Sequence, residues 1–458
     1  MEEKNNWVTT EISAVEFGDK RLNKRCVKLL EDLGDNPSGS LPSACKGWPE
    51  IMAAYRFLDN ELVTHEKILR PHKEATIKRI QGQKIVLLCQ DTTGISYTGR
   101  EKINGLGALT EEYQQGLYLH GMLAITPNKL CLGVVDSQIW TRAELGKRRR
   151  RKKQDISEKE SYRWIKGYEE ANEIARKAPD TMVVAVGDRE SDIYELFCKG
   201  KEVGNEAYWL VRVNHDRELL ANGCNKTKKR LKEELLNMPV ISTVEYNLSK
   251  GKGSRKVRQE VRVSKVTIKP PARKEVLGDV EATVVYCREI NTPKGEESIE
   301  WILLSNIGVD SEERALEIVQ WYLCRWQVEV YFRILKSGCL VEELQLKDAK
   351  RIEVCLALYM IVAWRILYVT MLGRSYPDIR CDIVFEEAEW KSAYYAAREK
   401  HPPKKAPLLK EMMRMIAELG GYLGRKSDGE PGAQAIWIGM QRMQDMAYGW
   451  YLALEAKA

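Results

Sequence analysis

Histidine is scarce in this chain of 458 residues, which contains only five, at positions 65, 72, 120, 215 and 401. Their spacing is unlike that of metal ligands, which argues against a histidine-built zinc or copper centre. Any metal ion in this protein is therefore expected to be a hard cation held by oxygen atoms, as Mg²⁺ is.

Cysteine pairs at metal-ligand spacing are also missing. The eleven cysteines are scattered, and no two of them form a C-x-x-C pair. This argues against a zinc ribbon and against the disulfide framework of a small secreted protein. Reduced cysteines suit the cytoplasm, so we expect a cytoplasmic protein.

A signal-peptide pattern and long apolar runs are absent as well. The longest apolar stretch, VCLALYMIVAW at 354–364, lies between Glu353 and Arg365. A bilayer-spanning helix needs about 20 apolar residues, so this stretch is too short. The sequence therefore predicts a soluble protein without a membrane partner.

Charge, by contrast, is plentiful: 30% of the residues are charged, 44% are hydrophobic, and the formal net charge is +7. That apolar content suffices for one large core or for two to three domains. The positive charge favours a polyanionic partner only weakly, because many basic proteins bind nothing anionic. The densest cluster, KRRRRKK at 147–153, is typical of a solvated loop but could equally hold DNA.

Residues 14–34 have the pattern of an amphipathic helix, with leucines on one face and five cations on another. The cations are Lys20, Arg21, Lys24, Arg25 and Lys28. They form either a solvated face or a surface that contacts phosphates. A second helix is predicted from about Pro49, so residues 1–70 are expected to form a small helical module.

The next segment alternates strands and helices. Short apolar strands are predicted at 84–91, 181–188 and 207–215, a hairpin at 116–140 and a helix at 161–178. This order is typical of a mixed α/β core. A Lys/Arg-rich, β-like insertion is predicted at 219–300, and the linker KHPPKKAP at 400–407 precedes two final helices.

The stretch QWYLCRWQVEVYFRILKSG at 320–338 predicts an apolar helix with one polar stripe. At 100° per residue, five polar residues fall within about 80° of one another: Tyr322, Arg325, Glu329, Arg333 and Lys336. The stripe is roughly 21 Å long, which exceeds a small-molecule pocket but suits a nucleic-acid strand with its repeating phosphates. We therefore expect the other faces of this helix to be buried.

Three carboxylates combine with this stripe. Asp91 and Asp188 each close a predicted strand, and Glu329 lies in the stripe itself. Taken singly, each aspartate could cap a following turn, and Glu329 could form an intrahelical ion pair with Arg325. Taken together, the three suit a two-metal site, in which two Mg²⁺ ions serve phosphoryl transfer.

In these motifs the chain resembles the insertion sequence 4 family of transposases. The family's catalytic-acid motifs are matched by DTTGISY at 91–97, VGDRESDIY at 186–194 and the Y-x2-R-x3-E-x6-K signature from Tyr322 to Lys336. Further matching segments are AAYRFLDN (53–60), EKESYRW (158–164), REINTPKGE (288–296) and LGGYLGRKSDGEPGAQAIWIG (419–439). The likeness runs from roughly residue 7 to residue 455.

The resemblance implies a ribonuclease H-like catalytic core with a β-rich insertion, flanked by an N-terminal helical DNA-binding module and C-terminal helices. The expected domains are a DNA-binding domain at 1–70, a core at 71–370 containing the insertion at 219–300, and a dimerisation domain at 371–458. Asp91, Asp188 and Glu329 would hold two Mg²⁺ ions, for which Mn²⁺ can substitute.

The resemblance also implies a cut-and-paste activity at the nucleoid, with cleavage through a hairpin intermediate and joining of the 3′ ends to a target. Expected partners are double-stranded DNA, as inverted repeats and as target, and a second copy of the chain. The five N-terminal cations would help to read the repeats.

Individual residues receive roles through the same resemblance. Tyr322, Arg325 and Lys336 would hold end phosphates and the hairpin, and Arg212 would contact DNA. Trp301 would stack on a base flipped out of the helix, or else be an ordinary core aromatic.

Two alternatives stay open. A ribonuclease H-like nuclease or resolvase would cleave DNA without joining it, and a non-catalytic regulator would bind DNA without cleaving it. The basic N-terminal module and the complete four-residue signature argue against the first. The presence of all three acids and of the N-terminal module argues against the second.

Overall fold

The computed structural model describes the whole chain except residues 1–6, 46, 100–102, 112, 143–154, 203–205, 221–228, 251–252, 273, 426–427 and 456–458. The basic run at 147–153 thus lies outside the described residues. The chain divides into two compact units. The first contains Met1–Arg79, Thr92–Gly146 and Gln327–Ala458, and the second contains Ile80–Asp91 and Lys147–Trp326. The architecture is mixed α/β, as the sequence predicts, with helices towards both chain ends.

Five helices open the chain: α1 (Trp7–Ile12), α2 (Lys20–Asp35), α3 (Leu41–Ala44), α4 (Trp48–Leu58) and α5 (His65–Gln81). The helix predicted at 14–34 begins only at Lys20, because the Asp19 carboxylate accepts a hydrogen bond from the Arg21 N–H at 2.8 Å and caps the helix there. The leucines of α2 are buried, as the amphipathic pattern predicts.

A buried charge cluster fixes α1 against α5. The Glu11 carboxylate accepts a hydrogen bond from Arg79 Nη1 at 2.7 Å and lies 2.6 Å from His72 Nδ1. The Val134 N–H donates to His72 Nε2 at 3.0 Å, so Nδ1 carries the ring proton and donates it to Glu11. Burial lowers the pKa of His72, and the nearby Glu11 carboxylate raises it by less. The pKa therefore lies below its usual value, and the ring is neutral at physiological pH.

The hairpin predicted at 116–140 is confirmed. β3 (Gln115–Ile125) and β4 (Cys131–Trp140) pair antiparallel, and the Thr126 N–H donates to the Leu130 carbonyl at 2.9 Å to close the turn. The two-residue β2 (Gly107–Ala108) pairs with β3. Nearly all of β3 is buried, which places this hairpin in the core of the first unit.

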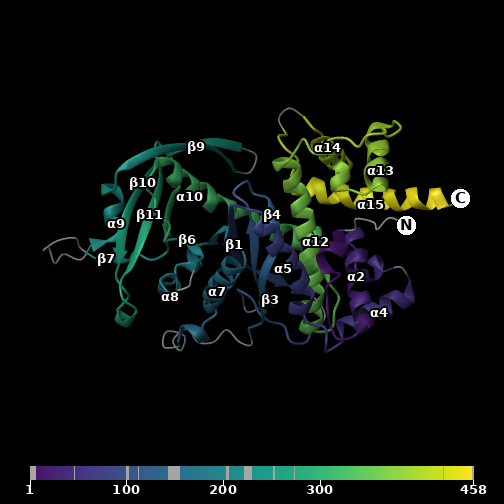
Figure 1. Ribbon diagram of the computed structural model, residues 1–458, viewed down its shortest axis with the longest axis horizontal. Coiled ribbons are helices and arrows are strands. Elements are labelled where there is room, and N and C mark those ends of the chain that lie inside the picture. Colours follow the sequence, from purple (N-terminus) through teal and green to yellow (C-terminus); the bar gives the residue numbers. More distant parts are fainter. Residues whose placement is uncertain are drawn as a thin grey trace. The chain divides into compact units, whose positions relative to one another are not determined.

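The apolar stretch at 354–364 forms the middle of α12 (Ala349–Ser375), the core helix of the first unit. By length and composition this 27-residue helix could cross a membrane, but 89% of its most apolar window is buried by the protein itself. Figure 1 shows α12 running through this unit, with α2 and α15 (Ala433–Glu455) packed against it. Its apolar surface is therefore used for packing, together with α13 (Glu387–Arg398) and α14 (Leu409–Leu419).

Three parallel strands form the centre of the second unit: the part of β1 (Ile85–Ser96) up to Asp91, β5 (Met182–Gly187) and β6 (Tyr208–Arg212). Their apolar runs are buried on both faces, as a parallel sheet requires. α7 (Tyr162–Lys177) covers β5. It also approaches β1 so closely that a Cβ atom on Gly167 would stand 2.0 Å from the side-chain oxygen of Gln90. Glycine at that position lets helix and strand meet.

Beyond β6 the sheet continues with antiparallel strands. In order of pairing these are β12 (Glu300–Ser305), β11 (Val280–Glu289) and β10 (Gly253–Ile268). β10 also pairs with β9 (Val240–Lys250) and with β7 (Glu218–Leu219), which pairs with β8 (Lys229–Arg230). Figure 1 shows β9, β10 and β11 together, at the end of this unit away from β1. Helices α8 (Tyr194–Lys199) and α9 (Leu231–Glu234) flank the strands.

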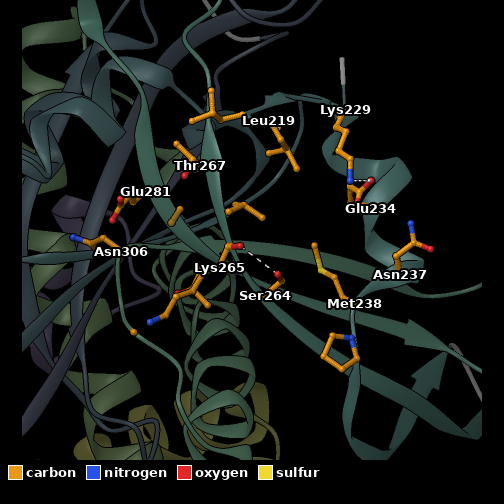
Figure 2. A pocket seen from close by; sticks show the side chains of 16 residues that line it. Leu219, Lys229, Glu234, Asn237, Met238, Ser264, Lys265, Thr267, Glu281 and Asn306 are labelled. Atoms are coloured by element: carbon orange, nitrogen blue, oxygen red, sulfur yellow. Dashed lines mark hydrogen bonds and ion pairs between the residues drawn. The ribbon is translucent and has the colours of Figure 1, made fainter. Parts of the chain in front are cut away.

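A pocket of about 570 Å³ opens in this antiparallel region, and Figure 2 shows its lining. Lys229 Nζ lies 3.2 Å from a Glu234 carboxylate oxygen, and the Ser264 hydroxyl donates to the Lys265 carbonyl at 3.2 Å. None of the residues predicted to bind metal or DNA lines this pocket. The candidate site must therefore be sought elsewhere, at the ends of β1 and β5.

The helix predicted to carry the polar stripe is interrupted twice. α10 (Glu312–Cys324) ends before Arg325, α11 (Trp326–Arg333) follows, and Ile334–Gly338 form a π-helical turn. A constant advance of 100° per residue, on which the predicted stripe rests, therefore does not extend to Lys336. The expectation of buried flanking faces is wrong at Trp326 and Leu323, which expose 57% and 37% of their surfaces.

Candidate active site

The two strand-end aspartates lie side by side. β1 and β5 run parallel, and the last pair of residues in register is Cys89 and Val186. Asp91 comes two residues after Cys89, and Asp188 comes two residues after Val186. Side chains alternate along a strand, so both carboxylates are expected on the same face of the sheet, at the carboxyl ends of the two strands. Neighbouring strands lie about 4.8 Å apart, so the two acids are close neighbours although 97 residues separate them in the chain.

Arg325 binds the first of these aspartates. Its Nη1 donates to Asp91 Oδ2 at 2.7 Å, and the two side chains expose only 12% and 19% of their surfaces. A charge-assisted hydrogen bond in such partly buried surroundings is stronger than an ion pair on the open surface. Arg325, which directly follows α10, therefore brings a cation to the acid carried by β1.

Asp188 closes β5 and caps the short turn that follows. Its Oδ1 accepts a hydrogen bond from the Glu190 N–H at 2.8 Å, and its carbonyl accepts one from the Ser191 hydroxyl at 2.6 Å. The capping role considered for this residue is thus present. A cap engages one carboxylate oxygen and is compatible with a cation at the other, because each oxygen has two lone pairs.

A buried ion pair holds the residues that follow Asp188. Asp192 accepts hydrogen bonds from the backbone N–H groups of Asn214 and His215, each at 2.7 Å, and from Arg217 Nε at 3.0 Å. Arg217 Nη2 donates to the Asp192 carbonyl at 2.9 Å, and neither side chain exposes more than 6% of its surface. This Asp192–Arg217 pair ties the turn that carries Asp188 to the loop after β6.

Tyr322 lies beside two guanidinium groups. The Arg325 guanidinium carbon stands 5.9 Å from the centroid of the tyrosine ring, and Arg212, whose Nη2 donates to the Glu300 carbonyl at 3.2 Å, is close enough to act on its hydroxyl. Burial raises the pKa of Tyr322, and the charges of Arg325 and Arg212 oppose that effect without overcoming it. The hydroxyl is therefore protonated at neutral pH. Among the described residues it has no hydrogen-bond partner in good geometry.

Trp301, on β12, lies between two tyrosine rings. The Tyr246 ring of β9 stacks on it, with centroids 5.9 Å apart and planes at 15°, and the Tyr322 ring stands 6.3 Å away at 55°. Arg212 lies on the same face of the sheet, because it pairs across the strands with Leu303, two residues after Trp301. The sequence leaves two roles open for Trp301, a buried core aromatic or an exposed platform on which a base stacks. Trp301 is half-buried, so its exposure lies between what these two roles require.

Glu329 and Lys336 belong to the first unit. Glu329 is half-buried on α11, four residues after Arg325. Lys336, in the π-helical turn, donates from Nζ to the Gly94 carbonyl of β1 and lies 3.6 Å from a Glu342 carboxylate oxygen. In the described part of the chain, no three His, Cys, Asp or Glu side chains form a group that could hold a metal ion. The place of Glu329 beside the two aspartates stays a prediction.

The five cations of α2 fall into two groups. Lys20, Arg21 and Lys24 are exposed, and Arg21 also pairs with Asp19 at 2.9 Å. Arg25 and Lys28 are half-buried and form ion pairs with Glu50 and Asp32, respectively. The first three are open to solvent, whereas Arg25 and Lys28 already stabilise the helical module.

Three residues of this region are missed by the sequence reasoning. Tyr246 lies in a Lys/Arg-rich alternating segment in which nothing distinguishes it from its neighbours. Asp192 lies inside the motif VGDRESDIY, whose second aspartate is a signal that could have been used. Arg217 has no local signal, because its role depends on a partner 25 residues away.

Two family models match this chain. A transposase DNA-binding model matches residues 4–63, and a model of the Tn5 transposase dimerisation domain matches residues 361–454. Both matches support a Tn5-like transposase. Its resemblance to the insertion sequence 4 family is consistent with these matches. In this transposase the DNA-binding and dimerisation segments stand on either side of the stretch that carries Asp91, Asp188 and Glu329.

Among solved structures, the transposase matches a cryo-EM structure of the piggyBac transposase synaptic complex with hairpin DNA. The TM-score is 0.32, with 12% sequence identity over 68% of this chain. The transposase spans 56% of the length of that piggyBac chain.

Proposed function

We propose that this transposase is a cut-and-paste enzyme. As a homodimer it binds the terminal inverted repeats of its element, cleaves the DNA at both ends and joins the freed 3′ ends to a target duplex. The observation that carries this function is the pair of aspartates on adjacent parallel strands, with Arg325 on Asp91, in a chain with DNA-binding and dimerisation segments. The parallel pairing of β1 with β5, which brings Asp91 and Asp188 to one edge of the sheet, also supports the ribonuclease H-like core that the resemblance implies.

The donor set fits Mg²⁺. Carboxylate oxygens are the ligands that Mg²⁺ prefers, and Asp91 and Asp188 supply them from neighbouring strand ends. Glu329 would be the third ligand, as the resemblance implies; it follows Arg325, which binds Asp91, by four residues in the chain. When bound, two Mg²⁺ ions, or Mn²⁺ in their place, would activate the attacking oxygen and stabilise the leaving oxygen of a phosphodiester.

The remaining residues would position the DNA. Arg325 and Lys336 supply positive charge for phosphates near the cleaved bond, and the protonated Tyr322 hydroxyl can donate a hydrogen bond to a phosphate oxygen. Trp301 and Arg212 lie on one face of the sheet, Trp301 beside Tyr322, and would receive a base displaced from the duplex. The exposed cations of α2 would contact phosphates of the inverted repeat.

The reaction we propose consists of successive phosphoryl transfers. Water breaks one phosphodiester at the transposon end and leaves a 3′-hydroxyl, which attacks the opposite strand and forms a hairpin. A second water reopens the hairpin, and the same 3′-hydroxyl then attacks a target phosphodiester. Each step exchanges one P–O bond for another, so no external energy source is required. We place these events in the cytoplasm, on the nucleoid.

The decisive experiment offers the purified protein two pre-cut transposon ends and a supercoiled target, with Mg²⁺ present. We expect joined products in which both 3′ ends are linked to the target. Cleavage of uncut ends without any joined product would instead identify a nuclease or resolvase on this fold. Binding with neither product would identify a regulator.

A further inference from the structure

After Lys336 the chain turns back to the end of β1 and is bonded there twice. The buried hydroxyl of Tyr97, the residue directly after β1, donates to the Val341 carbonyl at 3.0 Å. The N–H of Ser96, the last residue of β1, donates to Glu342 Oε1 at 2.9 Å. The Glu342 carboxylate therefore has a fixed place beside β1.

The backbone of this turn is strained at Leu340. Its φ angle is +50°, in the left-handed region that bulky side chains rarely adopt. Such a conformation persists only where surrounding contacts hold it, and it is concentrated at functional sites. The two hydrogen bonds to β1 are contacts of this kind. The contacts that bring Glu342 to β1 therefore outweigh a local conformational cost.

Glu342 in turn acts on Lys336. The Lys336 ammonium donates to the Gly94 carbonyl of β1 and lies 3.6 Å from Glu342 Oε1. The two side chains expose only 28% and 32% of their surfaces, so solvent screens their attraction less than it screens an ion pair on the open surface. An ammonium has three donors, and two of them remain after the bond to Gly94.

Glu342 could either hold Lys336 ready for a phosphate or compete with that phosphate. The distances favour the first role. At 3.6 Å the carboxylate attracts the ammonium without a hydrogen bond, so a phosphate has no such bond to break. A lysine side chain has much rotamer freedom, which a ligand must otherwise remove when it binds. A lysine held in place in advance avoids that loss.

We infer that Glu342 is a positioning residue, which holds the Lys336 ammonium at the Gly94 carbonyl, on the strand that carries Asp91. This inference rests on the proposed function, in which Lys336 binds a phosphate near the cleaved bond. It adds to that function the residue through which the protein arranges Lys336 before DNA arrives.

The test variant is Glu342→Gln in the full-length protein. A glutamine oxygen can still accept the Ser96 N–H, so only the charge is lost. The measurement is single-turnover cleavage, in Mg²⁺, of a duplex that carries the inverted repeat found beside the gene. Saturating duplex removes any effect of the lost charge on DNA affinity. We expect the cleavage rate to fall on the order of tenfold, because a small misplacement of a positioning group is costly.

Two further variants make the result specific. Glu343→Gln removes the same charge from the neighbouring, exposed residue and should cleave at the wild-type rate. Lys336→Ala should lose at least as much rate as Glu342→Gln. Combining Lys336→Ala with Glu342→Gln should cause no further loss, because two residues that act through one interaction are not additive. Circular dichroism checks that each variant is folded.

The outcomes separate this inference from the proposed function. A Glu342→Gln variant that cleaves as fast as Glu343→Gln, or faster, overturns the inference. So does a Lys336→Ala variant that cleaves at the wild-type rate. A loss from Glu342→Gln that persists in the Lys336→Ala background also overturns it, because Glu342 would then act without Lys336. A wild-type protein that binds the duplex in Mg²⁺ and never cleaves it contradicts the proposed function instead.

Discussion

Replacing Glu329 with alanine is expected to reduce DNA cleavage at the transposon end by at least about a thousandfold. The physical reason is that the third carboxylate would hold cations that stabilise the transition state by several kcal/mol. Each 1.4 kcal/mol of this stabilisation corresponds to a factor of about ten in the cleavage rate. Binding of the end duplex should change little, because phosphate contacts and base contacts come from other residues. The measurement is single-turnover cleavage of a labelled end duplex, together with its dissociation constant.

A matched control is available in the preceding helix. Glu317, on α10, is also a half-buried glutamate, and its carboxylate already pairs with Arg314 at 2.9 Å. Glu317→Ala should therefore cleave at the wild-type rate. A Glu329→Ala protein that cleaves as fast as Glu317→Ala would show that this residue has no part in the chemistry.

The second large effect concerns stability. Asp192→Ala is expected to lower the free energy of unfolding by about 3–5 kcal/mol, because it would leave the buried Arg217 guanidinium without its carboxylate. The Asn214 and His215 N–H groups would lose their acceptor as well, which adds a smaller loss because both residues are exposed to solvent. Urea denaturation, followed by tryptophan fluorescence, measures the difference.

An exposed ion pair provides the comparison for this variant. Lys410 and Asp378 lie 2.7 Å apart, with 50% and 75% of their side chains exposed. Asp378→Ala should cost less than about 1 kcal/mol, because solvent screens a pair on the surface. Equal losses for Asp192→Ala and Asp378→Ala would mean that the Asp192–Arg217 pair does not hold the turn after Asp188.

The catalytic acids illustrate what a sequence can reveal. Asp91 and Asp188 could be found because each ends an apolar run of strand length, and parallel strands bring such ends together. The predicted strand at 84–91 was nevertheless too short. β1 continues to Ser96 because its second half pairs with β3 in the first unit, where the Tyr97 N–H donates to the Gln115 carbonyl at 2.9 Å. A pairing partner that far along the chain leaves no local signal.

The helix that carries Arg325 shows the opposite case. Its existence followed from the apolar content, but the interruption at Arg325 and the π-helical turn before Cys339 did not. The Cys339 N–H bonds to the Ile334 carbonyl at 2.8 Å, which adds one residue to the turn and changes the direction of Lys336. Residue propensities do not distinguish such a turn from an α-helical one, because the same side chains suit both.

Contacts between distant polar residues were the hardest to foresee. The Tyr246 ring stacks on Trp301 only because β9 and β12 belong to one sheet, and Asp192 meets Arg217 only because β5 and β6 are neighbours. A hydrophobic period predicts which residues face the core, but it does not predict which polar side chains meet there.

The most direct test of the metal-holding role of Asp91, Asp188 and Glu329 is the binding of Mn²⁺, followed by electron paramagnetic resonance, to the protein on uncleavable end DNA. The wild type and Glu317→Ala should bind two ions per protomer, and Asp188→Asn and Glu329→Gln should each lose most of that binding while they retain the DNA. Undiminished Mn²⁺ binding in both of these variants would contradict the account, because the ions would then be held by other residues.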